Sequence, residues 1–149
     1  MPRRFLTFHA GGERYALELS DVAEVTEPRQ TFPLPVAPEY FAGIFNSHGT
    51  LTAVVDLSRY LGRGGRAAEG KFLLLDKRLA SLALWVDEVG AIVREDPSLS
   101  REPAEDPLLE ALLQTEDGAV KLIRIEALLA LLEEGVAAAA PEQNHNHNS

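Results

Sequence analysis

Short apolar runs separated by turn-forming residues cover most of the chain. The runs FLTFHA (5–10) and RYALELS (14–20) lie on either side of a Gly-Gly pair at 11–12. Such a pair can adopt the positive φ angles that a tight hairpin needs. The run DVAEVTE (21–27) follows as a third candidate strand. Residues 28–43 contain four prolines and therefore predict an extended loop without regular structure.

The segment GIFNSHGTLTAVVDL (43–57) predicts two strands around the polar break NSHG. Asn46 and Gly49 occupy the first and fourth positions that a type I turn favours, so His48 would stand third, at the exposed tip. The turn itself leaves the identity of His48 free. Four residues after the turn are expected to share one inward face, with the alternate residues on the opposite face: Leu51, Ala53, Val55 and Leu57.

Residues 59–71 form a glycine-rich basic connector, and the best internal boundary falls near 61–71. Three strongly apolar runs follow, and their weak alternation predicts strands buried on both faces: FLLLD (72–76), LASLALWVDEV (79–89) and GAIVRE (90–95). Residues 94–117 are acidic and contain prolines, so we expect a surface excursion. Within it, DPLLEALLQ (106–114) has helical spacing, yet its place before the hairpin signal EDG (116–118) favours a strand.

The last element is predicted to be a helix at 124–135, which Gly135 would end. Four apolar residues fall at the spacing of one helical face: Ile125, Leu128, Leu129 and Leu132. Residues 137–149 cannot form a core, and their alternating His and Asn resemble the remains of a metal-affinity tag, so we expect a disordered tail without function. Many short strands, regular turn signals and one late helix predict an all-β fold of small β-barrels with a C-terminal helix, rather than an α/β sheet.

Composition narrows the functional classes. The chain has 149 residues, which suits one domain or two small subdomains with a shared core. Its formal net charge of -9 makes it a poor nucleic-acid binder, because cationic side chains supply most of that affinity. It has no cysteine, which excludes disulfides and thiol nucleophiles and fits a cytoplasmic location. We expect neither a targeting segment nor a membrane-spanning stretch.

Two candidate catalytic patterns are incomplete. GRAAEGKF (65–72) matches most of a phosphate-binding loop, but Phe72 stands where Ser or Thr should bind magnesium, and a strand is expected to follow instead of a helix. Ser47, His48 and Asp56 are the residue types of a nucleophile triad. However, Ser47 and His48 are adjacent on a tight turn and should diverge, and no nucleophile elbow is present.

A metal site is not expected either, because His9 and His48 lie on different hairpins without nearby ligand partners. The sequence therefore predicts no enzyme, no cofactor and no metal. A binding module is the class that fits, because sheet edges and grooves of a small β protein can hold partners. A small β-barrel nucleotide-binding protein or hydrolase is the alternative from another class.

The order of the quoted segments carries a family resemblance. VAEV (22–25) is followed by a proline loop, the N-x-x-G turn at 46–49, VVDL (54–57), WVDEV (85–89) and a late helix rich in Leu-Leu pairs. Over roughly residues 4–134, this succession resembles the family of CheW-like domains of bacterial chemotaxis. The resemblance implies a single domain at 1–136 made of two SH3-like five-stranded β-barrels, with the C-terminal helix packed on them.

The same resemblance implies a non-catalytic cytoplasmic adaptor in signal transduction. Such a protein couples the cytoplasmic tips of methyl-accepting chemoreceptors to a CheA-type histidine kinase, whose regulatory domain has the same fold. Two alternatives stay within the family: the regulatory domain of a kinase, or a coupling protein of a surface-motility pathway. The resemblance assigns no residues to kinase binding.

For the receptor surface, the resemblance points to Val22, Glu24, Gly43, Asn46 and His48. At His48 the sequence departs from the family, which usually has Arg there. The usual Leu before it is likewise replaced by Ser. Arginine is permanently charged and offers a rigid fork of donors, whereas histidine changes charge near neutral pH. We therefore expect partner choice to differ from that of relatives at His48.

Overall fold

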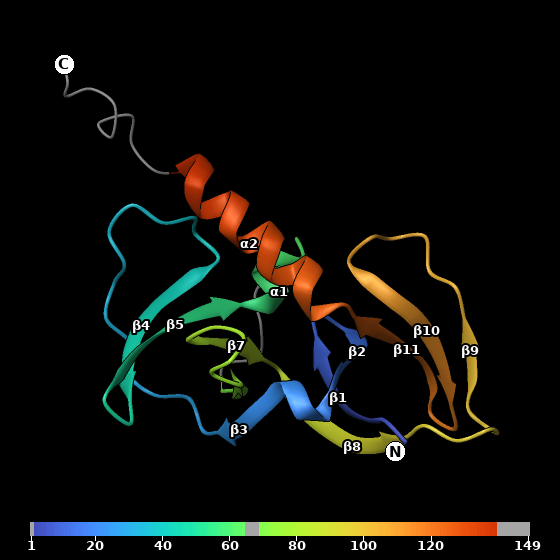
Figure 1. The fold of residues 1–149 in the computed structure, drawn as a ribbon. Helices are drawn as coiled ribbons and strands as arrows, with labels where there is room; N and C mark the ends of the chain where they lie inside the picture. Colours follow the sequence, from blue (N-terminus) through green and yellow to red (C-terminus); the bar gives the residue numbers. More distant parts are fainter. Residues whose placement is uncertain (1, 65–68, 140–149) are drawn as a thin grey trace.

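The computed structural model describes residues 2–64 and 69–139 of the chain, and these residues form two β-sheets and a C-terminal helix (Figure 1). The six-stranded sheet has the order β8-β1-β2-β11-β10-β9. Its strands are β1 (Arg4–Ala10), β2 (Glu13–Glu18), β8 (Glu88–Arg94), β9 (Ser100–Glu102), β10 (Leu109–Thr115) and β11 (Gly118–Ile123).

The five-stranded sheet has the order β3-β6-β7-β5-β4. Its strands are β3 (Val22–Thr26), β4 (Phe41–Ser47), β5 (Thr50–Asp56), β6 (Lys71–Leu75) and β7 (Leu82–Val86). The helices are a 3-10 turn η1 (Leu19–Asp21), the short α1 (Leu57–Tyr60) and α2 (Ile125–Ala139). Two strand pairs are parallel, β2 with β11 and β5 with β7, and the other pairs are antiparallel.

The two sheets are built from different parts of the chain. The middle of the chain, from β3 to β7, builds one sheet, while both ends of the chain build the other. The connector at 61–71, expected to separate two subdomains, joins β5 and α1 to a strand of the same sheet. The expected closed five-stranded barrels are also wrong, because the sheets have six and five strands and neither strand order closes on itself. The SH3-like assignment stays a prediction.

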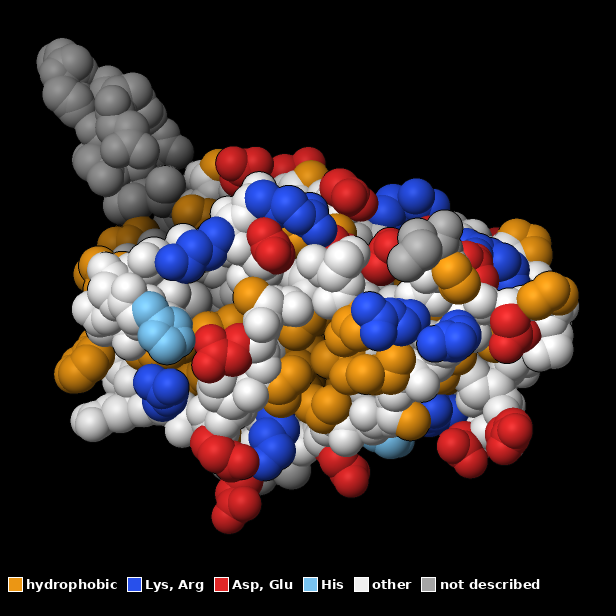
Figure 2. Space-filling model, turned by 60° about the horizontal axis from the view of Figure 1, so that its bottom comes forward, with side chains coloured by type: hydrophobic (Ala, Val, Ile, Leu, Met, Phe, Trp, Pro, Cys, Tyr) orange, Lys and Arg blue, Asp and Glu red, His pale blue; other side chains and the backbone are white. Residues whose placement is uncertain are grey.

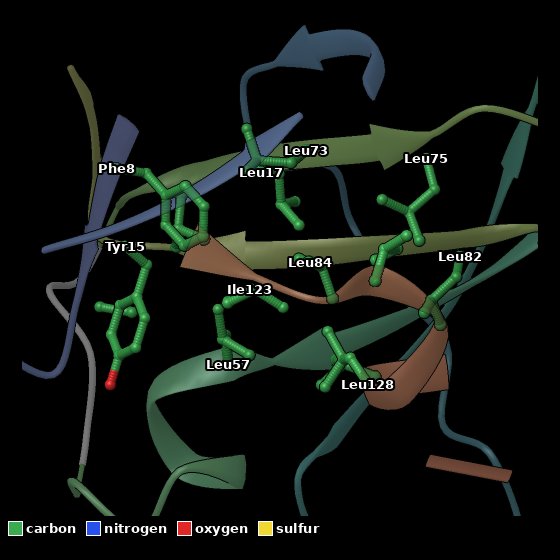
Figure 3. Close-up of a cluster of buried hydrophobic side chains, with 14 of the residues drawn as sticks. Phe8, Tyr15, Leu17, Leu57, Leu73, Leu75, Leu82, Leu84, Ile123 and Leu128 are labelled. Atoms are coloured by element: carbon green, nitrogen blue, oxygen red, sulfur yellow. The ribbon is translucent and has the colours of Figure 1, made fainter. Parts of the chain in front are cut away.

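The main core lies between the two sheets and beneath α2 (Figure 3). Phe8 from the six-stranded sheet, Leu84 from the five-stranded sheet and Leu128 from α2 are each fully buried there. Burying a side chain of this size contributes roughly 1.5–3 kcal/mol. Each sheet also covers a smaller cluster of its own, with Leu113 in one and Phe72 in the other. Both sheets are therefore apolar on two faces.

Several local predictions are confirmed. Gly11 and Gly12 have φ angles of 62° and 84° and join β1 to β2. The segment 106–114 contains strand β10, and the hairpin signal at 116–118 joins it to β11. The predicted helix exists and buries Ile125, Leu128 and Leu132.

Gly135 does not end the helix, contrary to the prediction, because α2 continues to Ala139. A Cβ atom on Gly135 would lie 2.1 Å from the Tyr40 hydroxyl oxygen, so the glycine permits a close approach of the helix. The helix also takes in the first three residues of the predicted tail, and the rest of that tail, 140–149, lies outside the described residues.

Two predictions about burial are wrong. GAIVRE was expected to be buried on both faces, but it belongs to β8, which forms an edge of its sheet and leaves Ile92 52% exposed. Residues 94–117 are not wholly a surface excursion, because β10 buries Leu109, Ala111 and Leu113. None of the helices in the described part of the chain is long and apolar enough to cross a membrane.

Candidate functional site

The structure brings two of the predicted site residues into contact. Glu24 lies on β3 and His48 lies at the turn between β4 and β5. Although β3 and β4 are opposite edges of the five-stranded sheet, His48 Nε2 lies 3.3 Å from Glu24 Oε1. The sheet therefore curls far enough to bring the tip of the β4–β5 hairpin to β3.

The hairpin turn differs from the predicted type I turn. Ser47 pairs with Thr50, so the loop contains only His48 and Gly49, with φ angles of 51° and 86°. Positive φ at both residues is the signature of a type I′ turn, whose twist matches that of the flanking strands. Asn46 Oδ1 accepts a hydrogen bond of 2.8 Å from the Gly49 backbone N–H.

This geometry changes the interpretation of His48. The turn does not leave its identity free, because a positive φ disfavours most side chains, and histidine is among the few that tolerate it. The imidazole is 67% exposed and the Glu24 side chain is 40% exposed. An exposed pair of this kind contributes at most about 1 kcal/mol. The contact can therefore rearrange at low cost when a partner approaches.

The inward face predicted for the strand after the turn is only partly confirmed. Val55 is fully buried between the sheets and Ala53 is half-buried, but Leu51 is 65% exposed. The opposite face is also buried, at Thr52 and Val54. The curl of the sheet buries the face that carries Thr52 and Val54. On the face that carries Val55, the elements that pack on the strand end before Leu51.

A small pocket of about 60 Å³ lies beside the His48–Glu24 contact. Leu74, Leu75 and Leu82 in its lining are buried, and Lys77 lines it together with Glu24 and His48. The lining comes from β3, the β4–β5 hairpin and the β6–β7 connection: Ala23, Glu24, Ser47, His48, Thr50, Thr52, Leu74, Leu75, Lys77, Ala80, Ser81 and Leu82.

The remaining predicted residues have structural roles. Val22 packs against the main core at the start of β3. Gly43 has a φ of 144°, and a Cβ atom there would lie 2.6 Å from the Phe32 carbonyl oxygen. Glycine therefore allows Phe32 to pair with Ile44 along β4. Sequence reasoning missed Lys77, for which the only signal was a turn-like position after the apolar run FLLLD.

The catalytic alternatives find no support in the geometry. Ser47 is buried, and Asp56 lies at the other end of β5, where its carboxylate accepts a hydrogen bond from the Arg59 backbone N–H. In the phosphate-loop-like segment, residues 65–68 lie outside the described part, and strand β6 begins at Lys71 where a helix would be required. Within the described residues, no three potential metal ligands of the His, Cys, Asp or Glu type gather.

Comparisons with known proteins agree on one family. The family model for the CheW-like domain matches residues 4–133. The chemotaxis protein CheW of Treponema pallidum (strain Nichols) is 24% identical over 110 residues, which cover 70% of this chain and 62% of the relative. The chemotaxis protein CheW of Rhizobium meliloti (strain 1021) is 26% identical over 93 residues, which cover 61% of this chain and 60% of the relative. The chain thus spans about three fifths of the length of these relatives.

A solved structure shares the fold. The scaffolding protein TtCheW from Thermoanaerobacter tengcongensis matches with a TM-score of 0.71 and 26% sequence identity. The match covers 84% of this chain and 86% of that chain. Because the family model also extends over nearly all of the residues in the two sheets and α2, the chain belongs to the CheW-like domain family.

Proposed function

We propose that this protein is a non-catalytic cytoplasmic adaptor of bacterial chemotaxis, which couples the tips of chemoreceptors to a CheA-type histidine kinase. The observation that carries the proposal is the match of residues 4–133 to the CheW-like domain. The structural neighbour with a TM-score of 0.71 is described as a scaffolding protein, which supports the same role. In this role the protein supplies binding surfaces and no reacting groups.

The receptor surface is proposed to lie where β3 and β8 approach each other. Figure 2 presents the face formed by the bottom of Figure 1, with hydrophobic side chains gathered near its centre and charged side chains around them. Val25 on β3 and Ile92 on β8 are 42% and 52% exposed. An amphipathic helix of a receptor can place its apolar face on such a surface. Glu24 and His48 then lie on the β3 side of the contact.

Binding of each partner should be measured separately by calorimetry, with a receptor-tip fragment and a kinase regulatory domain from the same organism. Val25→Ser should weaken receptor binding several-fold, because an apolar contact is lost. Leu131→Ser on α2 is the matched control, because Leu131 is 40% exposed and lies outside the proposed surface. Failure of the unmodified protein to bind either fragment would contradict the proposal.

A further inference from the structure

A groove of about 340 Å³ lies between α2 and the connection from β6 to β7. One wall of this α2 groove is a face of the helix that presents Leu129, Leu132, Glu133 and Val136, which follow one another over about two turns. The facing wall consists of the start of β4 and residues 79–82, which lead into β7. Two turns of helix extend for about 10 Å, which sets the length of the groove along α2.

The α2 groove is apolar at its base. Leu82 and Leu132 are at most 8% exposed, whereas Val136 is 41% exposed. The volume of the groove is about twice that of a cavity that holds one benzene ring, which is about 150 Å³. It therefore has room for two apolar side chains of a partner. Residues four positions apart on a helix lie about 6 Å apart on one face, so two such residues fit within its length.

The charge at the α2 groove is negative. Among the described residues that line it, Glu133 is the only charged one, and it forms no ion pair with any described residue. The helix itself contains three Glu residues and no Lys or Arg. On the facing connection, Arg78 is bound by Asp21 at 2.7 Å, and Lys77 lines the smaller pocket instead of this groove. A partner that combines apolar side chains with a cation complements this arrangement.

The same charge argues against three other occupants. Two copies of the chain that met through the same groove would bring their Glu133 carboxylates together, and each copy carries a net charge of -9. Nucleic acids and anionic membrane surfaces are repelled for the same reason. A cationic amphipathic helix matches both the apolar base and the carboxylate beside it.

We propose that the α2 groove docks a cationic amphipathic helix of a partner protein. The helix inserts two apolar side chains and places a Lys or Arg against Glu133. Figure 1 shows α2 at the top of the molecule and β3 and β8 at the bottom, so this site lies away from the proposed receptor surface. The inference therefore goes beyond the proposed function, because it adds a partner that binds while the receptor surface is occupied.

The test uses the full ¹⁵N-labelled chain and two designed helical peptides, one of leucine and lysine and one with glutamate in place of each lysine. The leucine–lysine peptide should shift the backbone amide signals of residues 79–82 and 132–136 saturably. The glutamate peptide should bind at least about tenfold more weakly. A receptor-tip fragment added in excess should leave the leucine–lysine peptide in place.

Two pairs of variants separate the groove from the overall acidity of the chain. Val136→Ser should weaken peptide binding about three- to tenfold, whereas Leu131→Ser should not, because Leu131 is 40% exposed on α2 but lies outside the lining. Glu133→Gln should weaken binding about two- to fivefold. Glu126→Gln should have a smaller effect, because Glu126 lies in the first turn of α2, outside the lining.

Equal effects within either pair of variants would reduce the binding to a general attraction between charges and would overturn the proposal. Equal binding of the glutamate peptide, or displacement by the receptor-tip fragment, would overturn it as well. A dimer of the free chain in analytical ultracentrifugation that Val136→Ser dissociates would assign the groove to a second copy instead. None of these outcomes changes the binding of the receptor and kinase fragments on which the proposed function depends.

Discussion

A charged network links Arg3, just before β1, to strands β2, β9 and β10 of the six-stranded sheet. The two terminal nitrogens of Arg3 donate hydrogen bonds of 2.7 and 3.0 Å to the two carboxylate oxygens of Glu110. Arg3 also contacts Glu18 at 2.8 Å, and Arg101 contacts Glu110 at 2.8 Å. Paired bonds between guanidinium and carboxylate are stronger than neutral hydrogen bonds. The Arg3 hydrogen bonds, with a smaller contribution from Arg101, lower the pKa of Glu110 from 4.5 to about 2.

This shift sets the expected cost of losing the carboxylate. A pKa lowered by about 2.5 units corresponds to at most about 3 kcal/mol of stability. The Glu110 side chain is 24% exposed, so solvent screening reduces this to about 1–2 kcal/mol. Glu110→Gln should therefore lower the free energy of unfolding by about 1–2 kcal/mol at pH 7.

The pH dependence follows from the direction of the shift. Because the folded-state pKa is the lower one, the stabilisation is complete above the ordinary value of 4.5 and is lost as the pH falls towards 2. The stability difference between Glu110→Gln and the unmodified protein should thus shrink steadily over that range.

Urea unfolding followed by circular dichroism at pH 7, 4 and 2.5 measures this difference. Glu102→Gln on β9 is the control, because Glu102 is exposed and has no ion pair with the described residues. Equal stability of Glu110→Gln and the control at pH 7 would show that the Arg3–Glu110 contact does not stabilise the fold. A difference that persists undiminished at pH 2.5 would contradict the lowered pKa of Glu110.

Four further substitutions test other parts of the structure. Gly135→Ala should lower the melting temperature, because the alanine Cβ would clash with the Tyr40 hydroxyl. This clash should outweigh the helix preference of alanine over glycine, which is about 1 kcal/mol. An unchanged or higher melting temperature would contradict the close approach of the helix to Tyr40. His48→Gly should stabilise the fold by up to about 1 kcal/mol in urea unfolding, since it relieves a positive φ, and a clear loss would speak against the type I′ turn. Leu51→Thr should change stability by less than about 0.5 kcal/mol, whereas Val55→Thr should cost more than about 1 kcal/mol; similar effects would contradict their different burial.

The predictable features of this fold are the local ones. The Gly11–Gly12 turn and the helical spacing of Ile125, Leu128 and Leu132 depend on neighbouring residues, so the sequence pattern was sufficient for them. The parallel pairing of Tyr15 with Lys121 joins distant parts of the chain, and no local pattern encodes it. That pairing places β2 and β11 in one sheet, whereas the strands on both sides of the predicted boundary at 61–71 belong to the other sheet.

The burial of single residues and the contact in the candidate site also depend on parts of the fold that no local sequence pattern encodes. Leu51 belongs to the set of alternating residues after the turn that are expected to point inward. It is nevertheless exposed, because the elements that pack on that face of the strand end before Leu51. Glu24 and His48 could be named from the family resemblance, but their contact depends on the curl of the sheet. Lys77 lies in the turn between β6 and β7, where neither periodicity nor a motif marks it.

The proposed adaptor role requires this protein to link a receptor tip to a CheA-type kinase. Its most direct test is the retention of a CheA-type kinase on beads that carry the receptor-tip fragment, measured with and without the full chain. We expect the kinase to be retained only when the chain is added, in proportion to the amount bound to the receptor. Kinase retention that does not change on addition of the folded chain would contradict it.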